Sequence, residues 1–212
     1  MQVEAFDRGV VRGFLHVPQD DVAAALVLTH GAGANCNSPL LIAVANAFCH
    51  AGFRVLRCDL PFRQRRPFGP PFPQSASEDR AALKAAAAMM RDSGATRIFL
   101  GGHSYGGRQA SILASEEPHV SESLLLLSYP LHPPKKPAEL RTAHFGKLGV
   151  PALFVHGTKD PFGSIEEMSA ALRGILAPTK LITINNAGHD LSRGKFDVEK
   201  LVVQPFQKLM NR

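Results

Sequence analysis

The chain alternates short apolar runs with longer segments of helical residue types, and glycine or proline separates most of them. The apolar runs predict strands at residues 10–17, 24–29, 53–58, 97–100, 124–127, 152–155 and 180–184. The segments between them predict helices at residues 40–50, 75–94, 107–114, 164–176 and 197–210. We expect an antiparallel first strand and otherwise a mostly parallel sheet with helices on both faces, which is an α/β architecture.

Local signals mark several helix ends. Ser75, followed three residues later by Glu78, is typical of a capping box, and Gly94 is typical of a helix stop. Ser164 is the expected N-cap of the helix that it begins. No internal repeat or linker interrupts the alternation. We therefore predict a single domain over residues 1–212, with no separate cap domain.

A G-x-S-x-G pattern centred on Ser104 lies between the predicted strand 97–100 and the predicted helix 107–114. A turn this sharp strains the serine backbone and leaves its hydroxyl free, which requires almost no side chain two positions before and after it. Gly102 and Gly106 meet that requirement. The pattern alone could arise by chance in a chain with 18 glycines, but its strand–turn–helix context makes Ser104 a candidate nucleophile.

A serine hydroxyl is a poor nucleophile at neutral pH, so it needs a base to take its proton and an acid to orient that base. Loops that follow parallel strands meet at one edge of a sheet even when they are far apart in sequence. Asp160 follows strand 152–155, and His189 follows strand 180–184. We predict Asp160 as the acid and His189 as the base.

Both assignments have alternatives. Asp160 precedes a proline and is also typical of a turn, while His189 also fits a surface loop. Asp59 follows an earlier strand and comes before the serine in the chain. Asp190 adjoins His189 and is expected to point elsewhere. Neither of these two carboxylates is predicted to be the acid.

Negative charge on a reacting carbonyl oxygen must be met by donors that are already in place. We predict the backbone N–H groups of Tyr105, at the start of a helix, and of Ala32, in an H-G-A-G turn, as these donors. The alternative for the glycine turn is a simple strand-to-helix connection. Three further histidines at strand ends are expected to be packed and hydrogen-bonded without a catalytic role, namely His30, His103 and His156.

The chain is basic, but the distribution of its basic residues gives little indication of a binding partner. The net charge is +6 and the isoelectric point about 9.5, but the basic residues form no long tract that would favour nucleic acid. They gather at Arg63, Arg65 and Arg66, in a loop rich in proline and phenylalanine. That loop is either solvated or a positively charged wall beside a pocket.

Several other functions have little support. The three cysteines lack C-x-x-C spacing, which argues against a disulfide framework and against a zinc site. The G-A-G turn lacks the third glycine of a dinucleotide fingerprint. Residues 1–8 contain acidic side chains and no apolar core of a secretory signal, and no stretch has transmembrane length. We expect a cytoplasmic protein without a membrane or nucleic-acid partner.

With these motifs in place, the chain resembles the α/β-hydrolase superfamily, which has the same order of serine, acid and histidine. The closer resemblance is to the small capless dienelactone-hydrolase-like family, which includes testis-expressed and histone-acetyltransferase-complex subunit relatives. It extends over nearly the whole chain and is carried by the segments THGAGAN, RCDLPFRQRRPFGPP, GGHSYGGR, SYPLHPPKKP, LRTAHF, VHGTKDPFG and AGHDL.

The resemblance implies a serine hydrolase fold without a lid, in a family whose substrates are mostly unassigned and whose eukaryotic relatives include scaffold-like members. Dienelactone hydrolase proper has a cysteine where this chain has Ser104, so dienelactone cleavage is not carried over.

The expected reaction is hydrolysis of a small-molecule carboxylic ester or thioester through an acyl-enzyme on Ser104, without a cofactor. The alternative is a non-catalytic binding or scaffold protein that keeps the fold. Four arginines, as a hypothesis, favour an acidic acyl or leaving group, namely Arg63, Arg65, Arg66 and Arg108.

Overall fold

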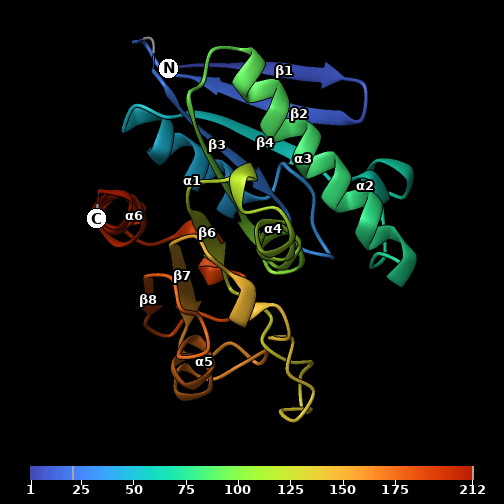
Figure 1. The fold of residues 1–212 in the computed structure, drawn as a ribbon, viewed down its shortest axis with the longest axis vertical. Coiled ribbons are helices and arrows are strands. Elements are labelled where there is room, and N and C mark those ends of the chain that lie inside the picture. The colour runs from blue at the N-terminus through green and yellow to red at the C-terminus, as the bar shows by residue number, and fades with distance from the viewer. Residues whose placement is uncertain (21, 212) are drawn as a thin grey trace.

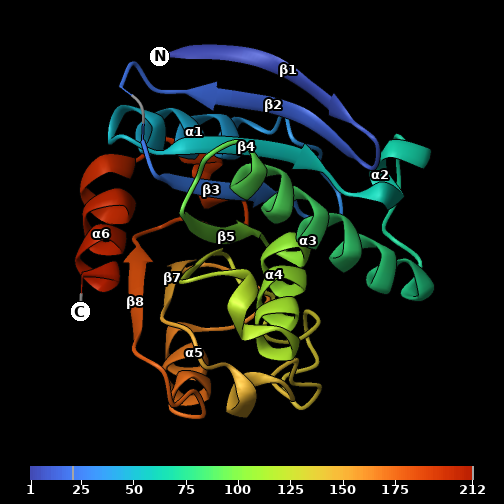
Figure 2. The same ribbon diagram turned by 45° about the horizontal axis from the view of Figure 1, so that its top comes forward.

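Eight strands form one sheet within residues 1–20 and 22–211, the part of the chain that this computed structural model describes. Their order is β1-β2-β4-β3-β5-β6-β7-β8, and the sheet twists across the molecule (Figures 1 and 2). β2 pairs antiparallel with β1 and β4, whereas all other neighbours are parallel. The strands are β1 (Gln2–Arg8), β2 (Val11–Val17), β3 (Ala24–Thr29), β4 (Arg54–Asp59), β5 (Arg97–His103), β6 (Leu124–Leu127), β7 (Ala152–Gly157) and β8 (Thr179–Ile184).

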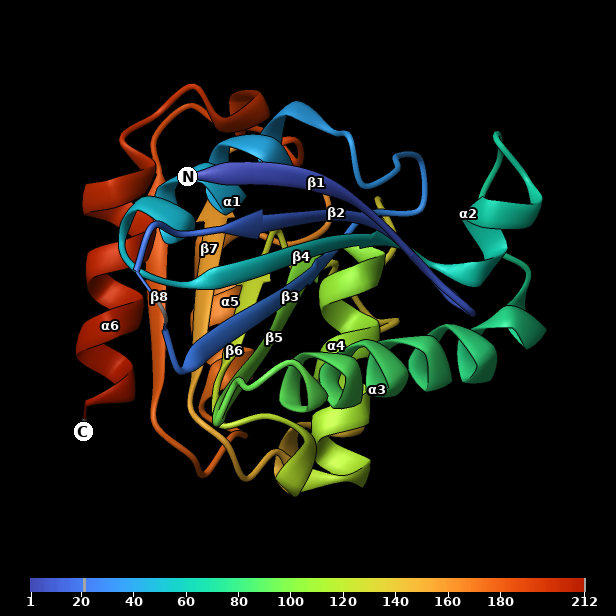
Figure 3. The ribbon, with the colours of Figure 1, turned by 90° about the horizontal axis from the view of Figure 1, so that it is seen from above.

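Helices cover both faces of the sheet, as predicted. Figure 3 shows α1 and α6 on one side of the strands and α3 and α4 on the other. The α-helices are α1 (Pro39–His50), α2 (Pro61–Arg65), α3 (Ala76–Asp92), α4 (Tyr105–Glu116), α5 (Ile165–Leu172) and α6 (Gln204–Met210). No segment of the described residues forms a separate cap over the carboxyl ends of the strands.

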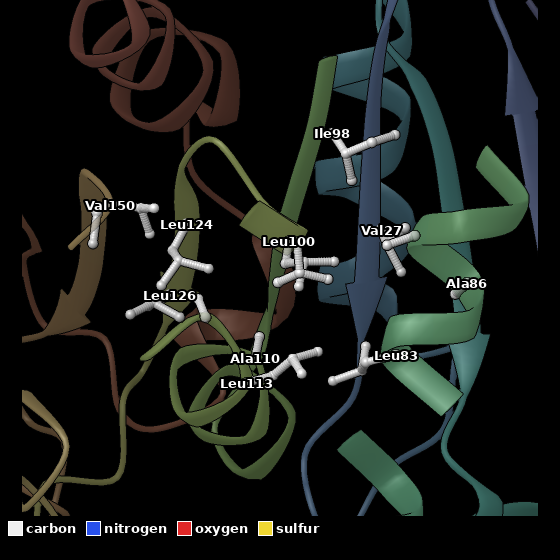
Figure 4. Close-up of a cluster of buried hydrophobic side chains, with 14 of the residues drawn as sticks. Val27, Leu83, Ala86, Ile98, Leu100, Ala110, Leu113, Leu124, Leu126 and Val150 are labelled. Atoms are coloured by element: carbon white, nitrogen blue, oxygen red, sulfur yellow. The ribbon is translucent and has the colours of Figure 1, made fainter. Parts of the chain in front are cut away.

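Alternate residues of the central strands fill two hydrophobic layers because successive side chains of a strand point to opposite faces. On the face of α3 and α4, buried strand side chains pack against apolar helix residues (Figure 4). The strand residues include Val27, Leu100 and Leu126, and the helix residues include Leu83 and Ala110. On the face of α1 and α6 the corresponding residues include Leu26, Leu28, Phe99, Leu125 and Phe206. This double burial explains why β3, β6 and β7 appear in the sequence as continuous apolar runs.

The amino-terminal strand β1 was not predicted. It pairs with β2 along its whole length, from Gln2 opposite Val17 to Arg8 opposite Val11. Phe6 is its one buried residue, since the strand lies at the edge of the sheet. A strand with so little burial carries no apolar alternation that a pattern search could find.

The two predicted N-caps have different outcomes. Ser164 caps α5 with the complete capping box, in which Glu167 bonds back to the Ser164 N–H. The box predicted at Ser75 is wrong. Ser75 already has helical backbone angles, because it ends a 3₁₀ turn (Pro73–Ser75) that runs directly into α3, and its side chain makes no capping bond. Glu78 pairs with Arg65 instead.

Two predicted helices differ in their extent. The helix predicted at 164–176 ends at Leu172, one turn early. The helix predicted at 197–210 is a π-helical turn (Glu199–Val203) followed by α6. Pro205 has no N–H to donate into the preceding turn, which favours a local change of hydrogen-bonding register at this point. Within the described ranges, no helix combines the length and apolar character needed to cross a membrane.

Candidate active site

Ser104 lies in the sharp turn between β5 and α4. Its φ of 51° and ψ of −115° place it in a strained region that non-glycine residues rarely adopt. Neighbouring glycines make the turn possible by close backbone packing. A Cβ atom at Gly102 would lie 2.6 Å from the Thr29 carbonyl oxygen, and one at Gly106 would lie 2.6 Å from the His30 carbonyl oxygen. The serine therefore stands at the carboxyl edge of the sheet.

The structure brings Ser104, Asp160 and His189 together. Asp160 lies in the loop after β7, and His189 lies in the loop after β8. The His189 Nδ1 atom is 2.8 Å from Oδ2 of Asp160, and its Nε2 atom is 2.8 Å from Oγ of Ser104. Because a carboxylate only accepts hydrogen bonds, Nδ1 carries the proton and Nε2 is free to accept one from the serine.

The carboxyl group of Asp160 is buried and held from several sides. The Phe162 N–H donates to its Oδ1 atom at 2.9 Å, and His156 Nε2 lies 3.7 Å from Oδ2. Burial alone would raise the pKa of this carboxyl, but the hydrogen bond from His189 and these neighbours outweigh it, so the pKa lies below its ordinary value. Asp160 is therefore ionised at neutral pH.

The other two carboxylates near the site are used elsewhere. Asp59 accepts the Cys36 N–H at 2.7 Å. Asp190 accepts the Ser192 N–H at 2.9 Å and lies 3.7 Å from Arg193, on an exposed turn. Neither carboxylate makes a hydrogen bond with His189 among those seen in the described chain.

Two aromatic rings hold His189 in place. The Phe162 ring lies 4.1 Å from the imidazole, centroid to centroid, at an angle of 31°. His103 Nε2 is 2.7 Å from the His189 carbonyl oxygen, so this nitrogen carries a proton and donates it. Burial lowers the pKa of His103 to about 4, which keeps it neutral. His103 thus anchors the backbone of the loop that carries His189.

The backbone amides of Ala32 and Tyr105 are arranged as free donors. Neither makes a backbone hydrogen bond within the described residues, and Tyr105 N is at the first turn of α4. The Gly31 carbonyl accepts the Ala34 N–H at 3.1 Å and lies 2.9 Å from His30 Nδ1. Since N–H and C=O point in opposite directions in a trans peptide, the Ala32 N–H points away from these partners.

Ser104, Ala32 and Tyr105 line one cavity of about 580 Å³. It is partly apolar, with Phe72, Ile112 and a row of prolines, and three arginines also line it, namely Arg80, Arg108 and Arg141. A smaller cavity of about 240 Å³ also reaches Ser104, and its lining includes His189, His103 and the 31–34 turn. Ala32, Ser104 and Phe162 line both cavities.

The four arginines singled out in the sequence separate in space. Arg108 lines the larger cavity. Arg63 is buried, and its guanidinium donates to backbone carbonyls, at 2.6 Å for Ala32 and 2.8 Å for Ala34. It therefore braces the turn that presents the Ala32 amide and is not free for a substrate. This differs from the sequence hypothesis.

Arg65 and Arg66 also lie outside the cavities that contain Ser104. Arg65 forms an exposed ion pair with Glu78, and Arg66 stacks over the Phe72 ring at 4.4 Å. In their place the structure adds two arginines that the residue patterns did not identify, namely Arg80 on α3 and Arg141 in the loop between β6 and β7. The only sequence signal for Arg141 was its position in the segment LRTAHF, which the family resemblance had singled out.

The mostly parallel sheet and the sharp turn at Ser104 between β5 and α4, called the elbow below, are those of an α/β-hydrolase fold. A comparison with known families supports this. Residues 22–203 match the model of a family described as alpha/beta hydrolase domain, and the chain belongs to that family.

Solved structures with low sequence identity have the same fold. Est1E from Butyrivibrio proteoclasticus, with ferulic acid bound, is 17% identical, with a TM-score of 0.78 over 99% of this chain and 100% of that one. Dienelactone hydrolase from Anabaena variabilis is 20% identical, with a TM-score of 0.74 over 100% and 98%. A Xanthomonas campestris protein described as a serine hydrolase without lid is 16% identical, with a TM-score of 0.73 over 98% and 94%.

Proposed function

We propose that the protein is a serine hydrolase that cleaves a small-molecule carboxylic ester or thioester through an acyl-enzyme on Ser104. The observation that carries the proposal is the unbroken hydrogen-bonded path from Asp160 through His189 to Ser104, with 2.8 Å at both steps. Phe162 and His103 hold His189 in this path through the ring contact and the hydrogen bond described above. The membership of the chain in the alpha/beta hydrolase domain family supports the same conclusion.

The first half of the reaction transfers the acyl group to the enzyme. Oγ of Ser104 attacks the carbonyl carbon while Nε2 of His189 takes the hydroxyl proton. The carbonyl oxygen becomes negative and accepts hydrogen bonds from the amides of Ala32 and Tyr105. Donors of this kind each lower the barrier by roughly 3 to 4 kcal/mol. The imidazolium then protonates the leaving alcohol or thiol as its bond to the acyl carbon breaks.

The second half releases the acid. A water molecule gives a proton to Nε2 of His189 and attacks the acyl carbon, and Ser104 leaves with the proton returned by the imidazolium. Asp160 keeps its negative charge throughout and stabilises the imidazolium in both halves. Apart from the substrate and this water molecule, the reaction scheme uses only side chains and backbone amides of the chain. The cytoplasmic location and the absence of nucleic-acid and membrane partners stay predictions.

A fluorophosphonate probe tests the proposal because it reacts with serine hydroxyls that a neighbouring base has activated. We expect one adduct on Ser104, detected by intact mass and by peptide mapping. Ser104→Ala removes the adduct, whereas Ser115→Ala, a serine further along α4, retains it. Absence of labelling in the folded wild-type protein, together with no turnover across a panel of esters and thioesters, contradicts the proposal and favours a non-catalytic binding protein.

A further inference from the structure

Two of the three arginines in the larger cavity have no carboxylate partner. Arg80 is neutralised, with its Nε 3.2 Å from Glu116 and its Nη1 3.0 Å from Gln109 Oε1. Arg108 and Arg141 take part in none of the ion pairs found among the described residues. The wall of the cavity beside the nucleophile therefore carries uncompensated positive charge.

Arg108 lies one helical turn beyond the nucleophile. Its N–H donates to the Ser104 carbonyl at 2.9 Å, and residues four apart on a helix lie on the same face. Its Nε atom is buried and finds no hydrogen-bond acceptor in the described part of the chain. A buried donor on a charged group is costly to leave unmatched, so this one is suited to an acceptor that arrives with a ligand.

The positive charge of Arg108 lowers the pKa values of two neighbouring groups, Arg141 and His144. Burial and the charge of Arg108 both lower the pKa of Arg141. Burial and Arg108 also lower the pKa of His144 to about 4, which leaves this histidine neutral. Tyr129, whose ring centroid lies 6.5 Å from that of His144, donates its hydroxyl proton to the Arg141 carbonyl at 2.6 Å. The charge of Glu139 raises the pKa of Arg141, but burial and Arg108 outweigh it. Among the described residues, no carboxylate forms an ion pair with Arg108 or Arg141.

Two carboxylates in this region, Glu139 and Asp79, already have other hydrogen-bond or ion-pair partners. Glu139, on the same loop as Arg141, is 2.8 Å from Lys136 Nζ. Asp79 accepts the Tyr105 hydroxyl at 2.7 Å and the Phe62 N–H at 3.2 Å. Arg80 and Lys136 therefore have carboxylate partners, whereas Arg108 and Arg141 have none among the described residues.

We expect the leaving group of the substrate to lie in the smaller cavity and its acyl chain to lie in the larger one. The leaving group must lie within reach of the base, since the imidazolium protonates it, and His189 lines only the smaller cavity. The acyl chain then extends into the larger cavity, toward the arginines. Apolar residues along that cavity, which include Phe72 and Ile112, suit a methylene chain.

We propose that the acyl part of the substrate ends in a carboxylate that Arg108 and Arg141 bind, so that the substrates are half-esters or half-thioesters of dicarboxylic acids. This inference rests on the serine hydrolase function proposed above and names its substrate class. The planar guanidinium matches a carboxylate with two parallel hydrogen bonds. The apolar residues that line the same cavity favour a methylene chain with a single terminal carboxylate.

Turnover of matched esters tests this assignment. Monomethyl adipate and methyl hexanoate have acyl chains of equal length and the same leaving group, and they differ in the terminal carboxylate. We expect the wild-type protein to prefer monomethyl adipate by about 10- to 100-fold in kcat/KM, as charge-assisted hydrogen bonds of this strength allow. The methyl ester of 5-phosphonopentanoate, which has the same number of methylene groups, is the third arm, and a preference for it over the carboxylate overturns the carboxylate assignment.

Substitutions locate the effect. Arg108→Gln and Arg141→Gln are each expected to reduce the preference for monomethyl adipate until the two esters react almost equally. Arg108→Lys keeps the positive charge but loses the two parallel N–H donors of the guanidinium, and it is expected to retain part of the preference. Arg97→Gln is the matched control because Arg97 starts β5, at the opposite end of that strand from Ser104, and pairs with Glu122. This control is expected to leave the preference unchanged, and thermal melts establish that each variant is folded.

The failure of this inference can be told apart from the failure of the proposed function. Labelling of Ser104 by the fluorophosphonate with equal turnover of the charged and neutral esters overturns the carboxylate subsite and leaves the hydrolase function intact. The same holds if the preference exists but survives in the Arg108→Gln, Arg141→Gln double variant. Absence of both labelling and turnover contradicts the function on which the subsite rests.

Discussion

At the scale of a single residue, Asp160 is a buried, ionised carboxylate that accepts a hydrogen bond from His189. Its two oxygens lie 2.8 and 3.0 Å from Nδ1, while the Phe162 N–H fixes the carboxyl group from the other side. An asparagine at this position has the same shape but carries no charge. It can also present an N–H to Nδ1, which would favour the tautomer with the proton on the wrong nitrogen.

Asp160→Asn is therefore expected to lower kcat by about 10³- to 10⁴-fold while the protein stays folded, which is the scale of the same change in the trypsin triad. Steady-state turnover of an ester substrate measures this. Asp190→Asn is the matched control, because that carboxylate lies on an exposed turn and, among the described residues, bonds to Ser192 and Arg193 rather than to the triad. Similar activity in both variants would mean that Asp160 is not the acid of the site.

At the scale of an element, the β5–α4 elbow depends on backbone atoms that pack without room for a side chain. A Cβ atom at Gly107 would lie 2.6 Å from the Gly102 carbonyl oxygen, and neither backbone segment can easily move. Gly146, in a 3₁₀ turn (Phe145–Lys147), has open space around the corresponding position. The two glycines therefore provide a matched pair.

Gly107→Ala is expected to destabilise the protein by about 1 to 3 kcal/mol, as overpacking of a well-packed site does. Gly146→Ala is expected to change the free energy of unfolding by no more than about 0.5 kcal/mol. Urea unfolding followed by circular dichroism measures both. Equal effects of the two substitutions would show that the elbow tolerates a methyl group and that its glycines serve another purpose.

The elements also show what the sequence can and cannot predict. Strands such as β6, with Leu124–Leu127 buried on both faces, were predicted because burial produces an unbroken apolar run. β1 was missed because an edge strand with one buried residue has no such pattern. The positions of Ser104, Asp160 and His189 followed from the rule that parallel strands open on one edge.

Arg63 and Arg141 show why the rest of the site could not be predicted. Nothing in the sequence near Arg63 indicates that its guanidinium reaches the carbonyl oxygen of Ala32, which lies on a different loop. Arg141 reaches the cavity only through the path of the loop between β6 and β7. Such roles depend on the three-dimensional course of loops, and local patterns carry no information about it.

At the scale of the whole molecule, buried neutral histidines link folding to pH. The pKa values of His16, His103 and His144 are each lowered to about 4, and burial is the largest cause in every case. Arg57 Nε donates to His16 Nε2 at 2.8 Å, so this nitrogen can accept but not carry a proton in the folded state. The unfolded chain protonates the same groups near their ordinary value of about 6.5.

Between about pH 6.5 and pH 4 the unfolded state therefore binds more protons than the folded state, and stability falls as the pH falls through this window. Each such histidine contributes at most about 1.4 kcal/mol per pH unit there. Urea midpoints measured from pH 7 to pH 5 are expected to decline, and His144→Gln is expected to flatten the decline. His119→Gln is the control because that side chain is 80% exposed. A decline that is equally steep in the His144 and His119 variants would show that the buried histidine is not the group whose protonation unfolds the protein.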